Sequence, residues 1–185
     1  MRVLSPEHRP VAVFLAKMLA AYVAWFVLYD LWLLPSGGLD GWVGRSAAVL
    51  SGGLLDALGF DPVVDGRVIT FPSGAGVWVA DACTGLATVG LFAGFVLAYP
   101  GSWARRAVFI PLGILAIHLA NVVRIAGLAW LRDVNPDLFE PVHLWGGTPF
   151  FYAVVFGLWV LWVHHGAAPK REVAPKVPAT GVAAA

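Results

Sequence analysis

The chain has 185 residues, of which 59% are hydrophobic and only 12% are charged. Soluble domains usually carry about 25% charged residues, so half that share indicates that a lipid bilayer is the solvent. The net charge of +1 says little about partners, and the absence of a Walker loop, a dinucleotide fingerprint and a basic stripe gives no support to nucleotide or nucleic-acid binding. The single cysteine leaves no partner for an internal disulfide, a CxxC redox pair or a thiolate-rich zinc site.

Four apolar runs are long enough to cross a hydrocarbon core, which takes about 20 helical residues. They cover residues 11–34, 83–99, 107–131 and 144–163. The first run is too long for the apolar region of a secretory signal, and no convincing cleavage site follows it, so we interpret it as a span.

Lysine and arginine residues indicate how these spans are oriented. They gather before the first span, between the second and third, and after the fourth: Arg2, Arg9, Lys17, Arg105, Arg106, Lys170, Arg171 and Lys176. With four spans all of these lie on one side, and the positive-inside rule assigns that side to the cytoplasm. We therefore expect both termini in the cytoplasm and most acidic residues, Asp40 among them, outside.

Residues 42–59 leave an alternative open. Their apolar positions recur at helical spacing, whereas Arg45 and Asp56 interrupt the run, which favours an amphipathic helix lying at the membrane interface. If this segment crossed the membrane instead, the N-terminal basic cluster would lie opposite the other two. We therefore prefer the arrangement with four spans.

A short β-element is expected between this helix and the cysteine. Val63 and Val64, then Asp65-Gly66, then residues 68–71 are typical of a hairpin with a type I′ turn, and SGAG gives a second turn before a third strand at 77–79. The segment 167–185 consists mainly of Ala, Pro, Val and Lys without a period, which indicates a disordered cytoplasmic tail. Residues 1–166 are thus expected to form an all-α polytopic membrane domain with four transmembrane helices, an interfacial helix and a small extracytoplasmic hairpin.

This topology brings three distant residues to the extracytoplasmic face. Cys83 opens the second span, Arg124 lies near the outer end of the third, and His143 immediately precedes the fourth. We expect Cys83 in the first helical turn, where free N–H groups and the helix dipole favour a thiolate. A thiolate nucleophile, a histidine that moves a proton and an arginine that stabilises the thiolate or an oxyanion would suffice for acyl transfer.

Each of these residues also has a structural interpretation. A lone thiol in an apolar setting commonly packs as a small hydrophobe, an arginine near a helix end can snorkel to the headgroups, and a lone histidine is commonly a loop residue. His118 lies one turn before Asn121 and indicates either an inward polar seam or, as we favour, a hydrogen bond between helices. Pro149 as a first helical residue would place His143 on a short re-entrant loop rather than on the helix.

Other polar residues near the three are weaker candidates for supporting roles. Asn121 lies one turn deeper than Arg124, Thr84 could cap the helix start, and Asp81 could modulate the thiol. Glu140 or Asp133 could orient His143. We expect no cofactor and no metal.

Taken together, ACTGL at residues 82–86, NVVRI at 121–125 and His143 resemble the exosortase and archaeosortase enzymes of prokaryotic membranes. The resemblance covers about residues 60–165, and its specificity comes from the order of the three elements and the membrane face that they share. Better-known members are longer, with additional spans, and Ser is commoner than Thr at the position of Thr84.

The resemblance implies a cysteine peptidase or transpeptidase of the prokaryotic inner membrane. Its substrates would be exported proteins with a C-terminal sorting tail, which contains a short motif, a transmembrane helix and a basic cluster. Cys83 would form the acyl-enzyme, His143 would protonate the leaving amine, and Arg124 would bind the thiolate or the oxyanion. A lipid or glycan amine, or water, would then resolve the intermediate. The alternative is a non-catalytic membrane scaffold of an envelope polymer or secretion assembly.

Overall fold

A computed structural model of the chain describes residues 8–166, without the side chains of residues 147 and 148. The tail expected at 167–185 lies outside the described residues. The described chain opens with a helix of 28 residues, in which α1 (Arg9–Trp25) continues through the π-helical segment η1 (Phe26–Leu33) and α2 (Leu34–Ser36). Gly37 ends this helix in a left-handed conformation (φ 65°), from which α3 (Gly38–Ala57) starts in a new direction.

Within residues 8–166, three helices are long and apolar enough to cross a membrane: Arg9–Ser36, α5 (Trp103–Val134) and Pro136–Gly166. The last of them combines α6 (Pro136–Pro141), η3 (Val142–Gly146), α7 (Gly147–Leu161) and η4 (Trp162–Gly166).

The remaining expected span is shorter than the sequence suggests. The helix α4 (Leu86–Ala98) has 13 residues. It therefore measures about 20 Å at 1.5 Å per residue, against a hydrocarbon core of about 30 Å. Three of the four expected spans are thus confirmed as candidates, and the count of four is not confirmed.

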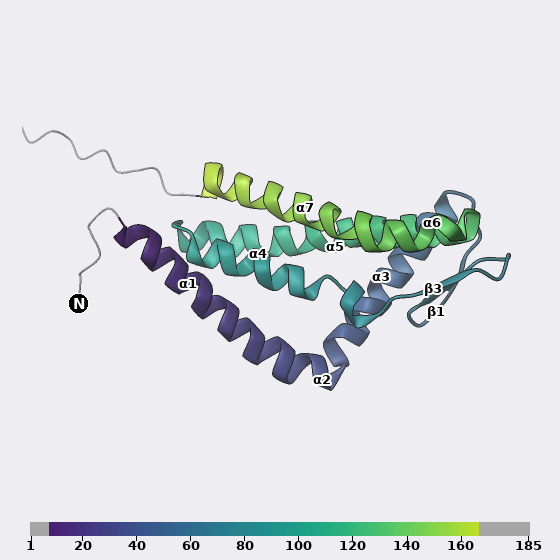
Figure 1. The fold of residues 1–185 in the computed structure, drawn as a ribbon, viewed down its shortest axis with the longest axis horizontal. Coiled ribbons are helices and arrows are strands. Elements are labelled where there is room, and N and C mark those ends of the chain that lie inside the picture. The colour runs from purple at the N-terminus through teal and green to yellow at the C-terminus, as the bar shows by residue number, and fades with distance from the viewer. Residues whose placement is uncertain (1–7, 167–185) are drawn as a thin grey trace, which may run out of the picture.

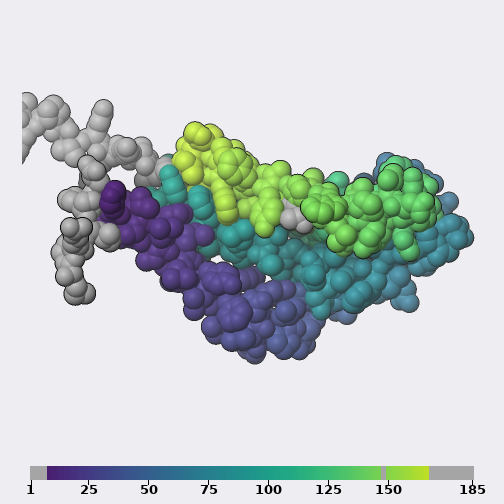
Figure 2. Space-filling model, viewed as in Figure 1, coloured from purple at the N-terminus to yellow at the C-terminus, as the bar shows by residue number. Residues whose placement is uncertain are grey.

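The helix α4, the helix α5 and the last helix lie side by side and alternate in direction, whereas α1 and α3 follow one another away from the N-terminal end (Figure 1). The start of α1, the connection from α4 to α5 and the end of α7 lie at one end, and α6 and the strands lie at the other, which we call the sheet end. At the first end Arg105 Nη1 donates to the carbonyl oxygen of His165 over 3.0 Å, which ties the start of α5 to the end of α7. The space-filling view shows α1 diverging from α7 toward α2 (Figure 2).

The helix α3 packs along the half of α5 that leads to the sheet end. It begins four residues before the expected amphipathic segment (38 against 42), and one face, with Val43, Ala47 and Leu55, is buried while Trp42 is exposed. Ser51 Oγ donates to the carbonyl oxygen of Val122 over 3.0 Å. The amphipathic pattern is therefore satisfied by packing on α5, and its position at the membrane interface stays a prediction.

A second polar contact between α3 and α5 involves His118. Its Nε2 lies 3.3 Å from Ser46 Oγ, within hydrogen-bonding distance. The favoured interpretation of His118 as an interhelical contact is therefore confirmed.

Three short strands form an antiparallel meander in the order β1 (Val63–Asp65), β2 (Val68–Thr70) and β3 (Gly76–Trp78). The expected meander is confirmed, but its first turn is shifted. Asp65 pairs with Val68, so the loop residues are Gly66 and Arg67. Only Gly66 has a positive φ (59°), and a type I′ turn needs two, so that turn type was wrong.

The sheet packs its core face against α3 and α5. Ile69, Phe71 and Val79 are buried together with Ala47 and Ala126. The small side chains on both helices let the sheet approach closely. As a result, β3 and the chain that follows it lie directly over α5.

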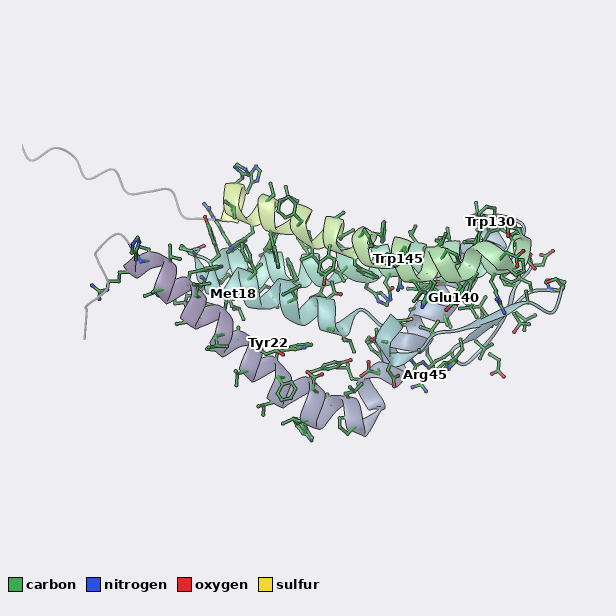
Figure 3. All side chains as sticks on the ribbon, in the orientation of Figure 1. Met18, Tyr22, Arg45, Trp130, Glu140 and Trp145 are labelled. Atoms are coloured by element: carbon green, nitrogen blue, oxygen red, sulfur yellow. The ribbon has the colours of Figure 1, made fainter. Side chains whose placement is uncertain are left out.

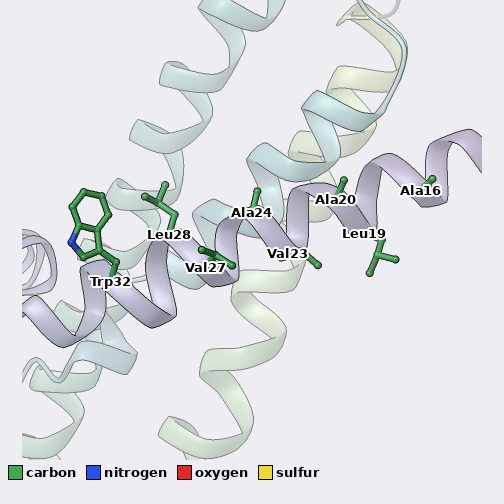
Figure 4. Close-up of a pocket in the computed structure, with 8 residues that line it drawn as sticks. All are labelled: Ala16, Leu19, Ala20, Val23, Ala24, Val27, Leu28 and Trp32. Atoms are coloured by element: carbon green, nitrogen blue, oxygen red, sulfur yellow. The ribbon is translucent and has the colours of Figure 1, made fainter.

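A large open hollow lies on the exposed side of α1, far from the sheet (Figure 4). Its volume is about 860 Å³, and its lining side chains all come from α1 and η1. Apart from one indole N–H, these side chains carry no polar group. This hollow therefore has none of the groups that chemistry would need.

Candidate active site at the sheet end

Cys83 lies on a short loop between β3 and α4 rather than in a helix. Residues Asp81–Cys83 form one 3₁₀ turn, and α4 begins only at Leu86. Gly85 between them has a φ of 81°, a backbone conformation that an L side chain rarely adopts. The expectation of Cys83 in the first helical turn was therefore wrong, because this glycine separates the turn from the helix.

The thiol itself is free and half-buried. It packs at the edge of the core that the sheet shares with α3 and α5. One side of the cysteine is thus fixed by packing, while part of its surface remains accessible.

Asn121 holds the cysteine backbone from α5. Its side chain is fully buried, and Nδ2 donates to the carbonyl oxygen of Cys83 over 2.7 Å. This hydrogen bond joins the predicted supporting residue directly to the loop. It places the backbone of Cys83 one helical turn away from Arg124.

Thr84 does not cap α4, which has no side-chain cap. Its buried hydroxyl lies 2.8 Å from the carbonyl oxygen of Asp81 and 3.0 Å from Asp40 Oδ1, so it can donate to either oxygen. The cap expected for Thr84 is therefore wrong, since the hydroxyl points toward α3 instead.

Asp40 is a residue of this site that the sequence did not reveal. It is fully buried in the first turn of α3 and also accepts a 2.8 Å hydrogen bond from the hydroxyl of Tyr29 on η1. Asp40 thus links the first helix to the residue beside the cysteine. An acid in the first turn of a helix is so common that nothing in the sequence distinguishes it from a solvated charge.

Asp81 is paired with a residue of the hairpin, not with the thiol. Arg67 Nη1 lies 2.6 Å from Asp81 Oδ1, and the Asp81 side chain is 47% exposed. The expected role of Asp81 beside the thiol has no hydrogen bond to support it.

Arg124 reaches the loop from α5. Its guanidinium carbon lies 5.3 Å from the centroid of the Phe151 ring on α7, a distance at which a cation interacts with an aromatic face. Its Nε is buried and has no hydrogen-bond partner among the residues that the structure describes. Arg124 is therefore oriented by an aromatic contact and keeps hydrogen-bonding capacity for another molecule.

His143 lies within a helix, since Pro136–Gly166 is helical throughout and contains both His143 and Pro149. Both predicted positions of His143, immediately before the fourth span and on a short re-entrant loop, are therefore wrong. The imidazole stacks on Phe139 at 5.6 Å with an angle of 9° between the rings. Its Nδ1 is buried and has no hydrogen-bond partner within residues 8–166.

The two acids expected to orient His143 do not bond to it. Glu140 is exposed, and the carboxylate of Asp133 accepts a hydrogen bond from Ser73 instead. The imidazole is therefore positioned by ring stacking rather than by a carboxylate.

One cavity of about 340 Å³ is lined by Cys83, Arg124, His143 and Glu140 together with β3. Figure 3 shows Glu140 at the sheet end, far from Met18 on α1. The three residues come from a loop, α5 and the last helix, so the fold and not the chain order brings them together. Within residues 8–166 no hydrogen bond joins the thiol, the guanidinium and the imidazole, although all three line this cavity.

The described residues contain no group of three or more His, Cys, Asp or Glu side chains that could hold a metal ion. The polar side-chain groups that line the cavity are a thiol, an imidazole, two guanidinium groups, one carboxylate and one indole N–H. This set can supply a nucleophile, a proton carrier and a cation for an oxyanion.

Comparison with known families places most of the described chain in one of them. Residues 9–160 match the family described as "Transmembrane exosortase (Exosortase_EpsH)". No curated protein and no solved structure matches the chain. Together with the apolar helices, the match identifies a multi-pass membrane protein, and it covers each element that lines the cavity. The chain belongs to the transmembrane exosortase family.

Proposed function

We propose that the chain is a membrane-embedded cysteine peptidase or transpeptidase that cleaves the C-terminal sorting tail of exported proteins. The observation that carries this proposal is the single cavity into which Cys83, Arg124 and His143 all project from separate elements. Membership of the exosortase family supports a membrane enzyme of protein sorting.

In the proposed reaction the Cys83 thiolate attacks the scissile carbonyl carbon. The electron pair of the carbonyl moves to its oxygen, and the Arg124 guanidinium stabilises the resulting oxyanion. Collapse of this intermediate breaks the C–N bond, and His143 gives a proton to the leaving amine. The substrate then remains attached to Cys83 as a thioester.

An amine of a lipid or glycan, or water, resolves the thioester in the second step. The incoming nucleophile loses a proton to His143 and replaces the sulfur, which leaves as the thiolate. An amine yields a new amide and water yields a free carboxylate. The proposal therefore includes attachment and release as two outcomes of one intermediate.

The proposed orientation places the sheet end outside the prokaryotic inner membrane. Arg9, Arg105 and Arg106 lie at the opposite end of the described chain, as the positive-inside rule requires of a cytoplasmic face. Both termini would then be cytoplasmic. The substrate would reach Cys83 after its export.

Replacement of Cys83 by Ala tests this function. In membranes that contain a tailed substrate, C83A is expected to stop processing without lowering the amount of inserted protein. Because Cys83 is the only cysteine, mass spectrometry can assign a substrate adduct to it, and hydroxylamine should release that adduct if it is a thioester. Continued processing by C83A would contradict the enzymatic proposal and favour the non-catalytic scaffold.

A further inference from the structure

The strand β3 has an unpaired edge that borders the candidate active site. The sheet order is β1-β2-β3, so β3 pairs with β2 on one side only. Five consecutive residues, 76–80, line the cavity that contains Cys83. Because side chains alternate between the two faces of a strand, a consecutive run can line one cavity only along the edge of the strand.

The backbone groups on this edge can be identified from the pairing of the sheet. Val79 N–H donates to Arg67 over 2.9 Å, and the carbonyl oxygen of Ala75 accepts from Phe71 over 2.8 Å. Residues 75, 77 and 79 thus direct their backbone groups toward β2. The alternate residues Gly76 and Trp78 direct theirs toward the cavity.

These outward groups have no partner within residues 8–166. No backbone or side-chain hydrogen bond in the described chain involves the N–H or carbonyl of Gly76 or Trp78. They form one donor and acceptor pair every second residue, which is the pattern that an added strand requires. The edge also leads directly toward Cys83, which follows Trp78 by five residues (83 against 78).

The opposite edge of the sheet offers no equivalent site. There the outward residue of β1 is Val64, whose side chain packs so closely against Gly52 of α3 that an added Cβ at this glycine would clash with it. Of the two edges, only β3 faces the cavity with the thiol.

We propose that an extended segment of the polypeptide substrate, adjacent to its scissile bond, binds β3 as a fourth strand. This inference rests on the proposed function, since it names the way in which the same site recognises its substrate. Backbone hydrogen bonds to Gly76 and Trp78 supply affinity that does not depend on substrate side chains. Alternate side chains of the added strand face Phe139, Glu140 and Arg132, which supply specificity.

The first test uses a peptide electrophile and the full chain in membranes. The probe is acetyl-tetra-alanyl chloromethyl ketone, whose carbon bonds to the Cys83 sulfur while chloride leaves. A set of probes carries one N-methyl group at each successive amide, which removes one donor at a time. We expect labelling of Cys83 to slow by about fivefold at alternate positions and little at the positions between. An equal effect at every position, or no effect at any, would overturn the proposal.

The second test changes the strand. W78P removes the outward N–H, and the β2–β3 hydrogen bonds do not use that group, so the sheet is expected to persist. W78A removes the same indole but keeps the N–H. Labelling by the unmethylated probe is expected to fall by about fivefold more in W78P than in W78A, with iodoacetamide labelling equal in both. Equal rates for the two variants would show that the edge does not bind the peptide.

Two outcomes separate this inference from its alternatives. If labelling slows as the enzyme concentration rises, a second copy of the chain pairs with β3, and the proposal is overturned. Alkylation of Cys83 does not require peptidase activity. An alternating N-methyl pattern together with normal processing by C83A would therefore uphold strand addition while refuting the proposed function.

Discussion

Two regions line the candidate active site: the loop that carries Cys83, and a helical wall formed by α5 with Arg124 and the last helix with His143. Different interactions hold the functional residues of these two regions in place. The loop is fixed by polar contacts from three elements: Arg67 to Asp81, Asp40 to Thr84, and Asn121 to the Cys83 carbonyl. The wall residues contact aromatic rings, and each has one buried nitrogen without a hydrogen-bond partner in the described part of the chain.

This difference predicts that substitutions in the two regions will affect stability and activity differently. A buried donor or acceptor without a partner costs about 1–3 kcal/mol, so the wall is destabilised by the groups that it keeps free. The residues that hold the loop also leave buried atoms without a partner among residues 8–166, namely Asp40 Oδ2, Asn121 Oδ1, Arg67 Nε and Arg67 Nη2. The two regions therefore differ in that direct polar contacts fix the loop, whereas none within the described chain fixes the two wall side chains. Substitutions in the wall should therefore lower activity alone, whereas substitutions around the loop should lower stability and activity together.

Arg124 offers the largest expected effect. R124M keeps an unbranched chain over the Phe151 ring but removes the cation, so processing should fall by about 100-fold or more while the amount of inserted protein stays unchanged. The matched control is R45M, which removes an exposed guanidinium on α3 that does not line this cavity, so processing should stay normal. Quantitative immunoblots of substrate and enzyme measure both quantities. Normal processing by R124M would show that the cation has no part in the reaction.

His143 should come next. H143A removes the proposed proton carrier and is expected to slow processing by about 100-fold. It breaks no hydrogen bond, so abundance should hold. Added imidazole should restore part of the rate, since the substitution leaves space beside Phe139. A variant that is slow but insensitive to imidazole would indicate that His143 acts by packing.

Asp40 tests the loop side of the comparison. D40L leaves the hydroxyl of Tyr29 without its acceptor, so the free energy of unfolding should fall by about 2 kcal/mol and processing per molecule by about tenfold. S51A on the same helix also removes one buried hydrogen bond, to Val122, but nothing that touches the loop. S51A should therefore lose stability while each remaining molecule works normally. Equal specific activities of D40L and S51A would contradict a positioning role for Asp40.

The sequence was sufficient to predict those elements of the fold that depend on a local property of the chain. Hydropathy located the three long helices, and the turn residues between short runs of valine and isoleucine located the meander. The order of Cys83, Arg124 and His143 along the expected spans predicted that they would lie on one face, and the structure places them around one cavity. Their chemical roles stay predictions.

The sequence pattern did not predict features that depend on distant contacts or on a single backbone torsion angle. Gly85 lies inside an apolar run that looks like continuous helix, and only its positive φ moves the start of α4 past Cys83. The importance of Asp40 depends on Tyr29 and Thr84, which lie 11 and 44 residues away. The residue pattern of a single segment therefore predicts neither the torsion angle of Gly85 nor the contacts of Asp40.

The smallest effect is expected for the ion pair between Arg67 and Asp81. The Asp81 side chain is 47% exposed, and solvent screens such a pair to at most about 1 kcal/mol. D81N should therefore change stability little and slow processing by less than about threefold. High salt should reproduce the loss in the wild type, because it screens the same pair. If D81N lowered stability and processing as much as D40L does, the ion pair between Arg67 and Asp81 would be essential for the position of the loop. The three contacts on the loop would then act as one cooperative unit rather than independently.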